Sequence, residues 1–138
     1  KAFEFSQAPE HGAVASFVGT IRNRNFGRDV VGITYDVFVP LAETTLQTLC
    51  SQAQAQCGDD LKIFIEHFKG RLEVGGISVV ITVSSTHRNE AFKACRYIIE
   101  GIKHKCPIWK REHYIDGDSQ WMEGHALCQA HASEQEKV

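Results

Sequence analysis

The sequence has no long hydrophobic run and no excess charge of either sign, and each absence excludes a class of protein. Its most apolar stretch, residues 77–83, contains serine and threonine and is far shorter than the roughly 20 residues that a transmembrane helix needs. The formal net charge is −2, so the surface as a whole has no broad attraction for nucleic acid or anionic lipid. We therefore expect no membrane segment, and any anion site must come from local clusters of Lys and Arg.

The cysteines also lack a pattern. There are five of them, an odd number, and none is in a C-x-x-C motif, which argues against a disulfide framework. No signal-peptide core lies near Lys1. This usage fits the reducing cytosol, so we expect a cytoplasmic protein. We also expect no cofactor. Because the sequence starts with Lys rather than Met, a targeting segment ahead of it is left open.

Length and composition predict one domain. A chain of 138 residues is long enough for one hydrophobic core and short for two domains. Its 43% hydrophobic and 23% charged residues are typical of a folded globular protein. We predict a single domain over residues 1–138, with a polar tail that frays from about residue 126.

Hydrophobic periodicity predicts an alternation of strands and helices. The expected elements are a strand at 13–18, a polar loop at 21–29, a strand at 30–38, a helix at 41–57, a strand at 61–68, a glycine-containing connector at 69–76, a strand at 77–83, a second helix that ends before Pro107, and short strands at 108–115 and 120–122. This order indicates an α+β domain in which both helices cover a largely antiparallel sheet.

Two features define the predicted helices. Pro40 suits the start of the first helix. In the second helix Ala91, Cys95, Ile98 and Ile102 recur at helical spacing, which makes it the clearest of the predicted elements. The hydroxyls of residues 84–86 are expected to cap its start.

Three arginines, Arg22, Arg24 and Arg28, fall within seven residues of the predicted polar loop. Guanidinium groups on such a loop can bind a phosphate bidentately. A solvated hairpin loop gives the same pattern and is the more common explanation. The loop is therefore a candidate anion site, with a structural role as the alternative.

His87 and Arg88 directly follow a buried strand and open the second helix. Free N–H groups and the helix dipole favour an anion at this position, whereas two cations there cost about a few tenths of a kcal/mol of helix stability. A bound anion would cancel that cost. Anion binding and a neutral structural role are equally supported by this feature.

The basic residues around Pro107 form the third cluster. Lys103 and Lys105 in the last helical turn suit the helix dipole, but Lys110 has no such explanation. Because Pro107 forces the chain to turn, Lys103 and Lys110 can face one cleft. There each ammonium lowers the pKa of the other toward the range that acid–base or nucleophilic chemistry uses.

Two rival functions are open to these residues. A non-catalytic module could bind a phosphate ligand or RNA, with Trp109, Tyr97 and Phe26 as stacking surfaces. The negative net charge argues against it, so we expect no nucleic acid partner.

A metal site is the second rival. Its ligands would be Cys106, His104, His113 and His125. Their spacing matches no standard zinc set, and scattered histidines are usually solvated or packed residues. We therefore expect no bound metal.

Several motifs closely resemble the large-subunit family of molybdopterin synthase. They are Gly19-Thr20-Ile21-Arg22-Asn23, the step Thr86-His87-Arg88 into a helix, Lys103 followed by Pro107-Ile108-Trp109-Lys110-Arg111-Glu112, and Trp121-Met122-Glu123. The lysine followed by Pro-Ile-Trp-Lys, a basic residue and Glu is specific, whereas the arginine loop alone is weak. In order, the motifs span most of the chain.

The resemblance implies an α/β-hammerhead-like fold, a central homodimer, and a small ubiquitin-like sulfur-carrier subunit at each end of a heterotetramer. The C-terminal Gly-Gly thiocarboxylate of that carrier would donate sulfur to cyclic pyranopterin monophosphate. The product would be the dithiolene of molybdopterin, an intermediate of molybdenum cofactor biosynthesis.

The resemblance also assigns residues. It makes Lys103 and Lys110 the catalytic pair. Around the substrate it places both lysines together with Thr20, Ile21, Arg22, His87, Arg88, Arg111 and Glu112. One departure stands before the first helix, where the family usually has Glu, Tyr and Met and this chain has Asp36, Phe38 and Leu41. We expect these changes to alter fine contacts with the substrate.

Overall fold

The computed structural model of the chain describes residues 1–122. Its elements, in order, are α1 (Ala2–Ser6), β1 (Ala13–Thr20), β2 (Arg24–Asn25), β3 (Arg28–Val37), α2 (Val39–Cys57), β4 (Lys62–His67), β5 (Gly70–Glu73), β6 (Ile77–Ser85), α3 (Arg88–Lys105), β7 (Ile108–Tyr114) and β8 (Ser119–Trp121). The predicted α+β class is confirmed, while the tail expected from residue 126 lies outside the described residues.

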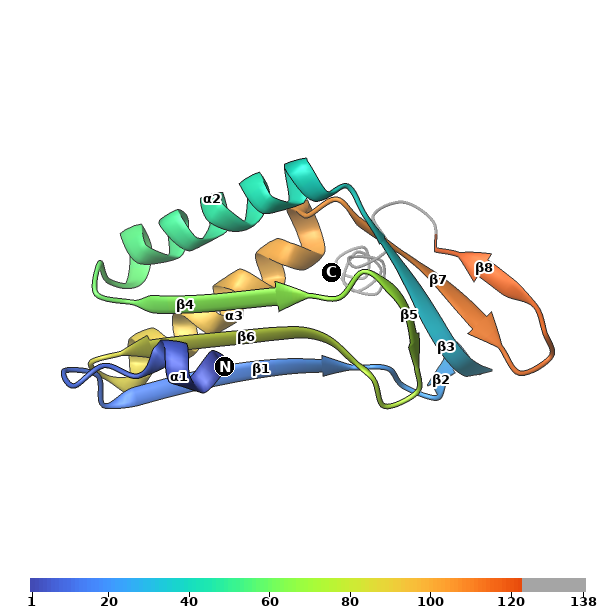
Figure 1. The fold of residues 1–138 in the computed structure, drawn as a ribbon, viewed down its shortest axis with the longest axis horizontal. Coiled ribbons are helices and arrows are strands. Elements are labelled where there is room, and N and C mark those ends of the chain that lie inside the picture. The colour runs from blue at the N-terminus through green and yellow to red at the C-terminus, as the bar shows by residue number, and fades with distance from the viewer. Residues whose placement is uncertain (123–138) are drawn as a thin grey trace, which may run out of the picture.

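The first sheet carries the hydrophobic core. In it β6 lies between β1 and β4, and both pairs are antiparallel. α3 packs across β1 and β6 with its residues Ala91, Ala94, Cys95, Ile98, Ile99 and Ile102 buried. The sequence predicted that both helices lie on the sheet, but α2 has its main contacts with α3 (Figure 1).

The two helices approach closely at one point. A Cβ atom on Gly101 of α3 would lie 2.4 Å from Cδ2 of Leu49, a buried residue of α2. Only a hydrogen fits there, so glycine lets α2 settle against α3. None of the helices in residues 1–122 combines the length and the hydrophobicity that crossing a bilayer requires.

The second sheet is built around β3 and stands across one end of the first (Figure 1). β3 pairs antiparallel with β2, β5 and β7, and β7 pairs with β8. The pairing of β3 with β7 starts where α2 begins and α3 ends. At this point the N–H of Phe38 donates to the carbonyl of Pro107 at 3.1 Å. Lys110 is thereby placed opposite Tyr35, on the same face of the sheet.

Three sequence expectations are wrong in detail. The polar loop at 21–29 contains β2 and the start of β3, joined by a two-residue turn at Phe26 and Gly27. The connector at 69–76 contains β5, which pairs with β3. The expected caps do not form, because Ser85 donates its hydroxyl proton to the carbonyl of His87 and Thr86 donates to Asp60.

The short helix α1 had no signal in the sequence, since one turn is too brief to show a period. Its Ser6 hydroxyl lies 2.7 Å from that of Thr82. The ring of Phe5 lies 6.0 Å from that of Phe64. These contacts hold α1 on the face of the first sheet that α3 leaves uncovered.

The β2–β3 turn yields a stability prediction. Phe26 has φ +47° and Gly27 has φ +76°, which is the type I′ geometry that favours Asn-Gly. The Phe26 side chain is 71% exposed, so little apolar burial is lost on replacement. We expect Phe26→Asn to raise the free energy of unfolding by about 1 kcal/mol, measured by urea denaturation with an unchanged m-value.

Gly27→Ala provides the matched control, because it places a side chain at positive φ and should lower the urea midpoint. A midpoint for Phe26→Asn at or below that of the unmodified protein would contradict the strain assigned to Phe26.

Candidate active site

A cavity of about 350 Å³ lies where the C-terminal end of α3 meets the second sheet. Its walls come from the end of β1 and the segment after it, the β2–β3 turn, one residue each of β3, β4 and β7, the start of β6, the last turns of α3 and Met122. The polar groups that concern its chemistry are Thr20, Arg22, Tyr35, His67, Lys103 and Lys110. Residues distant in sequence therefore converge on one volume.

Both predicted catalytic lysines line this cavity. Lys103 lies in the last turn of α3 and Lys110 on β7. Burial lowers the pKa of Lys110 below its ordinary value. The carboxylate of Glu112 opposes this shift, whereas the positive charges of Arg22 and Lys103 lower the pKa further. The structure thus places an amine with a lowered pKa beside two other cations.

Glu112 is the buried carboxylate that balances this group of cations. It is 2% exposed and lies two residues from Lys110, on the same face of β7. Its Oε2 accepts a hydrogen bond from Asn25 Nδ2 at 2.7 Å, and its Oε1 accepts one from the Tyr114 hydroxyl at 2.9 Å. Glu112 itself does not line the cavity. It holds Asn25 in place, and Asn25 lines the cavity.

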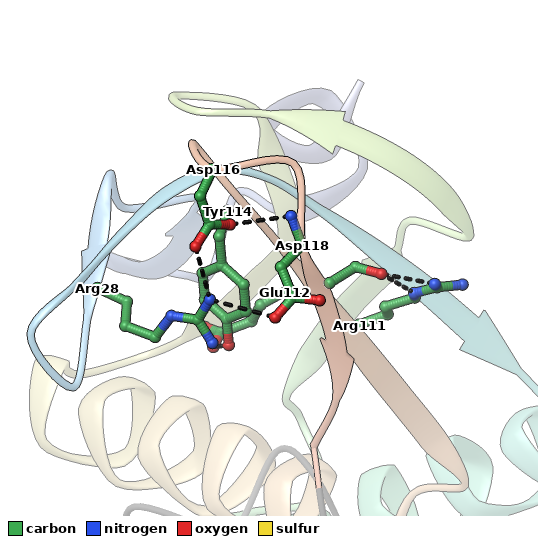
Figure 2. A network of polar contacts seen from close by, with 7 residues as sticks. Arg28, Arg111, Glu112, Tyr114, Asp116 and Asp118 are labelled. Carbon is green, nitrogen blue, oxygen red and sulfur yellow. Dashed lines mark hydrogen bonds and ion pairs between the residues drawn. The ribbon is translucent and has the colours of Figure 1, made fainter.

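Only Arg22 of the three clustered arginines lines the cavity. Arg28 stacks 3.5 Å above the ring of Tyr114 and reaches Asp116 and Asp118 at 3.3 and 3.4 Å (Figure 2). Arg24 pairs with Asp29 at 3.1 Å. For these two arginines the structural alternative is correct, since each has a carboxylate partner.

Ile21 and Arg111 also lie apart from the cavity. The side chain of Ile21 is 3% exposed and belongs to the core. Arg111 points to the opposite face of β7 from Lys110, where its Nε donates to the Ser119 hydroxyl at 2.9 Å and its guanidinium lies over Trp121. The structure does not bring these two side chains to the predicted substrate site.

His87 and Arg88 lie at the far end of α3. Arg88 is its first residue, and Lys103 is in its last turn. At about 1.5 Å of rise per residue, the two are roughly 22 Å apart along the helix axis. One chain alone therefore does not bring His87 and Arg88 to the cavity.

Two of the titratable lining residues had no assigned part in the sequence analysis. They are Tyr35 on β3 and His67, the last residue of β4. A signal for His67 was present, because Ile63, Ile65 and His67 alternate along one side of a strand. A histidine at an inward position, at the end of a strand, marks a polar group that faces the interior.

Within residues 1–122 the residues named for the RNA site and the metal site do not form one site. The Tyr97 hydroxyl donates to Gln52 at 2.8 Å and joins α3 to α2. Phe26 lines the cavity, whereas Trp109 is on the other face of β7 from Lys110. Within residues 1–122 no group of three or more His, Cys, Asp or Glu residues is arranged to hold a metal. His125, the fourth residue of the metal hypothesis, lies outside this part of the chain.

Comparison with known proteins shows the family of the chain. The family model of the MoaE protein matches residues 1–105, well over half of the chain. The chain belongs to the MoaE family. Among MoaE relatives, the molybdopterin synthase catalytic subunit of Synechococcus elongatus is 49% identical over 132 residues, which cover 96% of this chain and 80% of the relative. The corresponding subunit of Arabidopsis thaliana is 38% identical over 118 residues, covering 86% and 59%.

Solved structures share the MoaE fold. Molybdopterin synthase from Staphylococcus aureus superposes with a TM-score of 0.82 at 34% identity, covering 88% of this chain and 87% of that one. A complex of subunits 1 and 2 of the molybdopterin-converting factor from Helicobacter pylori gives a TM-score of 0.70 at 21% identity, covering 85% and 75%. At that identity the second match shows the fold alone.

The electrostatics of the cavity can be tested through Lys110. Glu112→Gln removes the charge that raises the Lys110 pKa, so the pKa should fall. Arg22→Gln removes a charge that lowers it, so the pKa should rise. NMR titration of the lysine Cε and Hε signals would follow both variants, with the exposed Lys93 as an internal reference. Shifts of the same sign in both variants would contradict the arrangement.

Proposed function

We propose that this chain is the catalytic subunit of a molybdopterin synthase and acts as a sulfurtransferase. It would transfer sulfur from the thiocarboxylated C-terminus of a small carrier subunit to cyclic pyranopterin monophosphate, forming the dithiolene of molybdopterin. One observation carries the proposal. In a MoaE-family chain, a lysine on α3, a lysine on β7 and an arginine between β1 and β2 line one cavity of about 350 Å³, and the lysine on β7 has a lowered pKa.

The lysines divide the chemistry in this proposal. Lys110, with its lowered pKa, exchanges protons with the reacting groups. Lys103, at the exposed side of the cavity, supplies positive charge that attracts the thiocarboxylate and stabilises the oxyanion formed when its carbonyl is attacked. The guanidinium of Arg22 binds the phosphate of the precursor through paired hydrogen bonds, with the Thr20 hydroxyl beside it.

The remaining predicted residues support the site indirectly. Glu112 positions the β2–β3 turn through Asn25 and adjusts the charge of Lys110. Ile21 anchors the segment before Arg22, because its main chain bonds to Gly75 and Gly76. Arg111 fixes β8 through Ser119. These three residues therefore act through others and do not contact the substrate in this proposal.

His87 and Arg88 reach the substrate only if a second copy supplies them. β1 is an edge strand of the first sheet and exposes Val14 and Val18. It starts beside the N-terminus of α3, where Gly12 bonds to Thr86, and it ends at the cavity. Antiparallel pairing of β1 with its twofold-related copy would bring His87 and Arg88 of one chain to the cavity of the other. This arrangement supports a homodimer.

The carrier is the other partner of this assembly. A thiocarboxylate carries a negative charge, so its tail would enter a cavity whose charged lining groups in residues 1–122 are Arg22, Lys103 and Lys110. Glycine residues at the end of the tail would suit the narrow space between α3 and the second sheet. Two carriers on a homodimer give the proposed heterotetramer, and we place the reaction in the cytoplasm.

The proposal predicts the effect of removing each amine. Reconstituted turnover with thiocarboxylated carrier and precursor should be almost lost in Lys110→Ala and severely reduced in Lys103→Ala, by about 10²-fold or more. Lys93→Ala, which removes an exposed lysine on the same helix outside the cavity, is the matched control. Unmodified turnover in both cavity variants would remove the catalytic assignment.

The composite site predicts complementation. Arg22→Ala and Arg88→Ala should each weaken precursor binding by about 1.5–3 kcal/mol, the usual value of a hydrogen bond to a charged group. Co-expression of the two variants gives hybrid dimers in which one site has both arginines and the other has neither. Binding in isolated hybrids should therefore recover unmodified affinity at half the sites. If no site of the hybrids recovers unmodified affinity for the precursor, both arginines of a site come from the same chain.

A further inference from the structure

The cavity holds one basic group that the lysine chemistry leaves unused. His67 ends β4 on the side of the strand that faces the interior, and its ring lines the cavity with Lys103 and Lys110. The ring of Tyr35 meets it at 5.0 Å and 78°, an edge contact. Because two elements of different sheets hold this imidazole, its orientation in the cavity is fixed.

The hydrogen bonding of His67 defines its protonation. Nδ1 lies 2.8 Å from the carbonyl oxygen of Phe68. A carbonyl only accepts, so Nδ1 must carry the proton. Burial lowers the pKa of His67, and the bond to Phe68 opposes this only in part. At neutral pH the ring is therefore uncharged, and its lone pair is on Nε2.

The surroundings make this lone pair useful. Within residues 1–122 the charged side chains that line the cavity are all cations, from Arg22, Lys103 and Lys110, and no carboxylate is among them. Burial raises the pKa of the Tyr35 hydroxyl, so it stays protonated and is no base. His67 Nε2 has no hydrogen-bond partner within these residues, so it is available to take a proton. Unlike a carboxylate, a neutral imidazole can act as the base without placing a buried anion in the cavity.

From this geometry we propose that His67 is a further catalytic residue, the general base for the water that releases the carrier after sulfur transfer. The inference rests on the proposed function, in which sulfur transfer leaves the carrier joined to the pterin through an acyl–sulfur bond. The positive charge of Lys103 then stabilises the oxyanion of the tetrahedral intermediate, while His67 activates the nucleophile.

The step balances without a further reactant. The water oxygen bonds to the acyl carbon as one of its protons passes to His67 Nε2. The carbon–sulfur bond then breaks, and its electron pair leaves with sulfur as a thiolate. The imidazolium returns its proton to that sulfur, which leaves a thiol on the pterin and a carboxylic acid on the carrier. The acid loses its proton to solvent, and His67 is neutral again.

His67→Asn is the test variant, because an asparagine amide can keep the hydrogen bond to the Phe68 carbonyl but has no basic nitrogen. We expect turnover to fall by about 10²- to 10⁴-fold. Intact-mass spectrometry of a single turnover should show the carrier–pterin adduct accumulating, and added imidazole should restore its breakdown. His113→Asn is the matched control, since His113 bonds to Thr34 on the opposite face of the second sheet.

Turnover of His67→Asn within about threefold of the unmodified enzyme would overturn the assignment. A slow variant with no adduct and no rescue would overturn it as well, because a structural role gives that result. A second measurement needs no variant. Adduct breakdown in the unmodified enzyme should slow as the pH falls through the lowered pKa of His67, below 6.5, and pH-independent breakdown would contradict the role.

The experiment separates the two proposals. If the unmodified protein makes no dithiolene product from carrier and precursor, the proposed function fails. If the unmodified protein is active and His67→Asn retains that activity, the assignment of His67 alone fails.

Discussion

The antiparallel pairing of β3 with β7 determines which side chains of these two strands line the cavity. It joins the strand that precedes α2 to the strand that follows α3, with the Phe38 to Pro107 hydrogen bond at its start. The register puts Lys110 opposite Tyr35 and turns both toward the last turn of α3. A slip of one residue would exchange the two faces of β7. Arg111 would then face the cavity, and Lys110 and Glu112 would point away from it.

Bringing cations together in a partly buried cavity has an electrostatic cost, and the second sheet offsets it. Glu112 is buried on the same face as Lys110, and both its oxygens accept hydrogen bonds. The carboxylate limits the fall of the Lys110 pKa that burial, Arg22 and Lys103 cause. It also holds Asn25, so the same group that balances charge positions the turn next to the cavity. Removing either the buried carboxylate or the cations near it would leave a buried charge without a partner, which is costly. The charge balance of the site and the position of the turn therefore depend on the same residue.

The sequence predicted what depends on local pattern. The strands at β1, β4 and β6 and the helix α3 follow from alternation and helical spacing, and Pro107 marks the bend that lets two lysines meet. The short strands β2 and β5 were missed because two and four residues give no period, and their pairing with β3 is decided by tertiary contacts. The side of β7 on which Arg111 points depends on register, which no motif reveals. The distance from His87 to Lys103 follows from the length of α3. It shows that the family motifs, taken together, do not lie around one pocket of one chain.

The central claim is that the two amines flank the reacting acyl carbon. The most direct measurement is a crystal structure of the protein bound to its carrier, with the tail ending in a carboxylate that cannot react. The account predicts that the terminal carboxylate lies in the cavity, within hydrogen-bonding distance of both Lys103 Nζ and Lys110 Nζ. A carrier tail seated on another face of the molecule, with the cavity empty of it, would contradict the account.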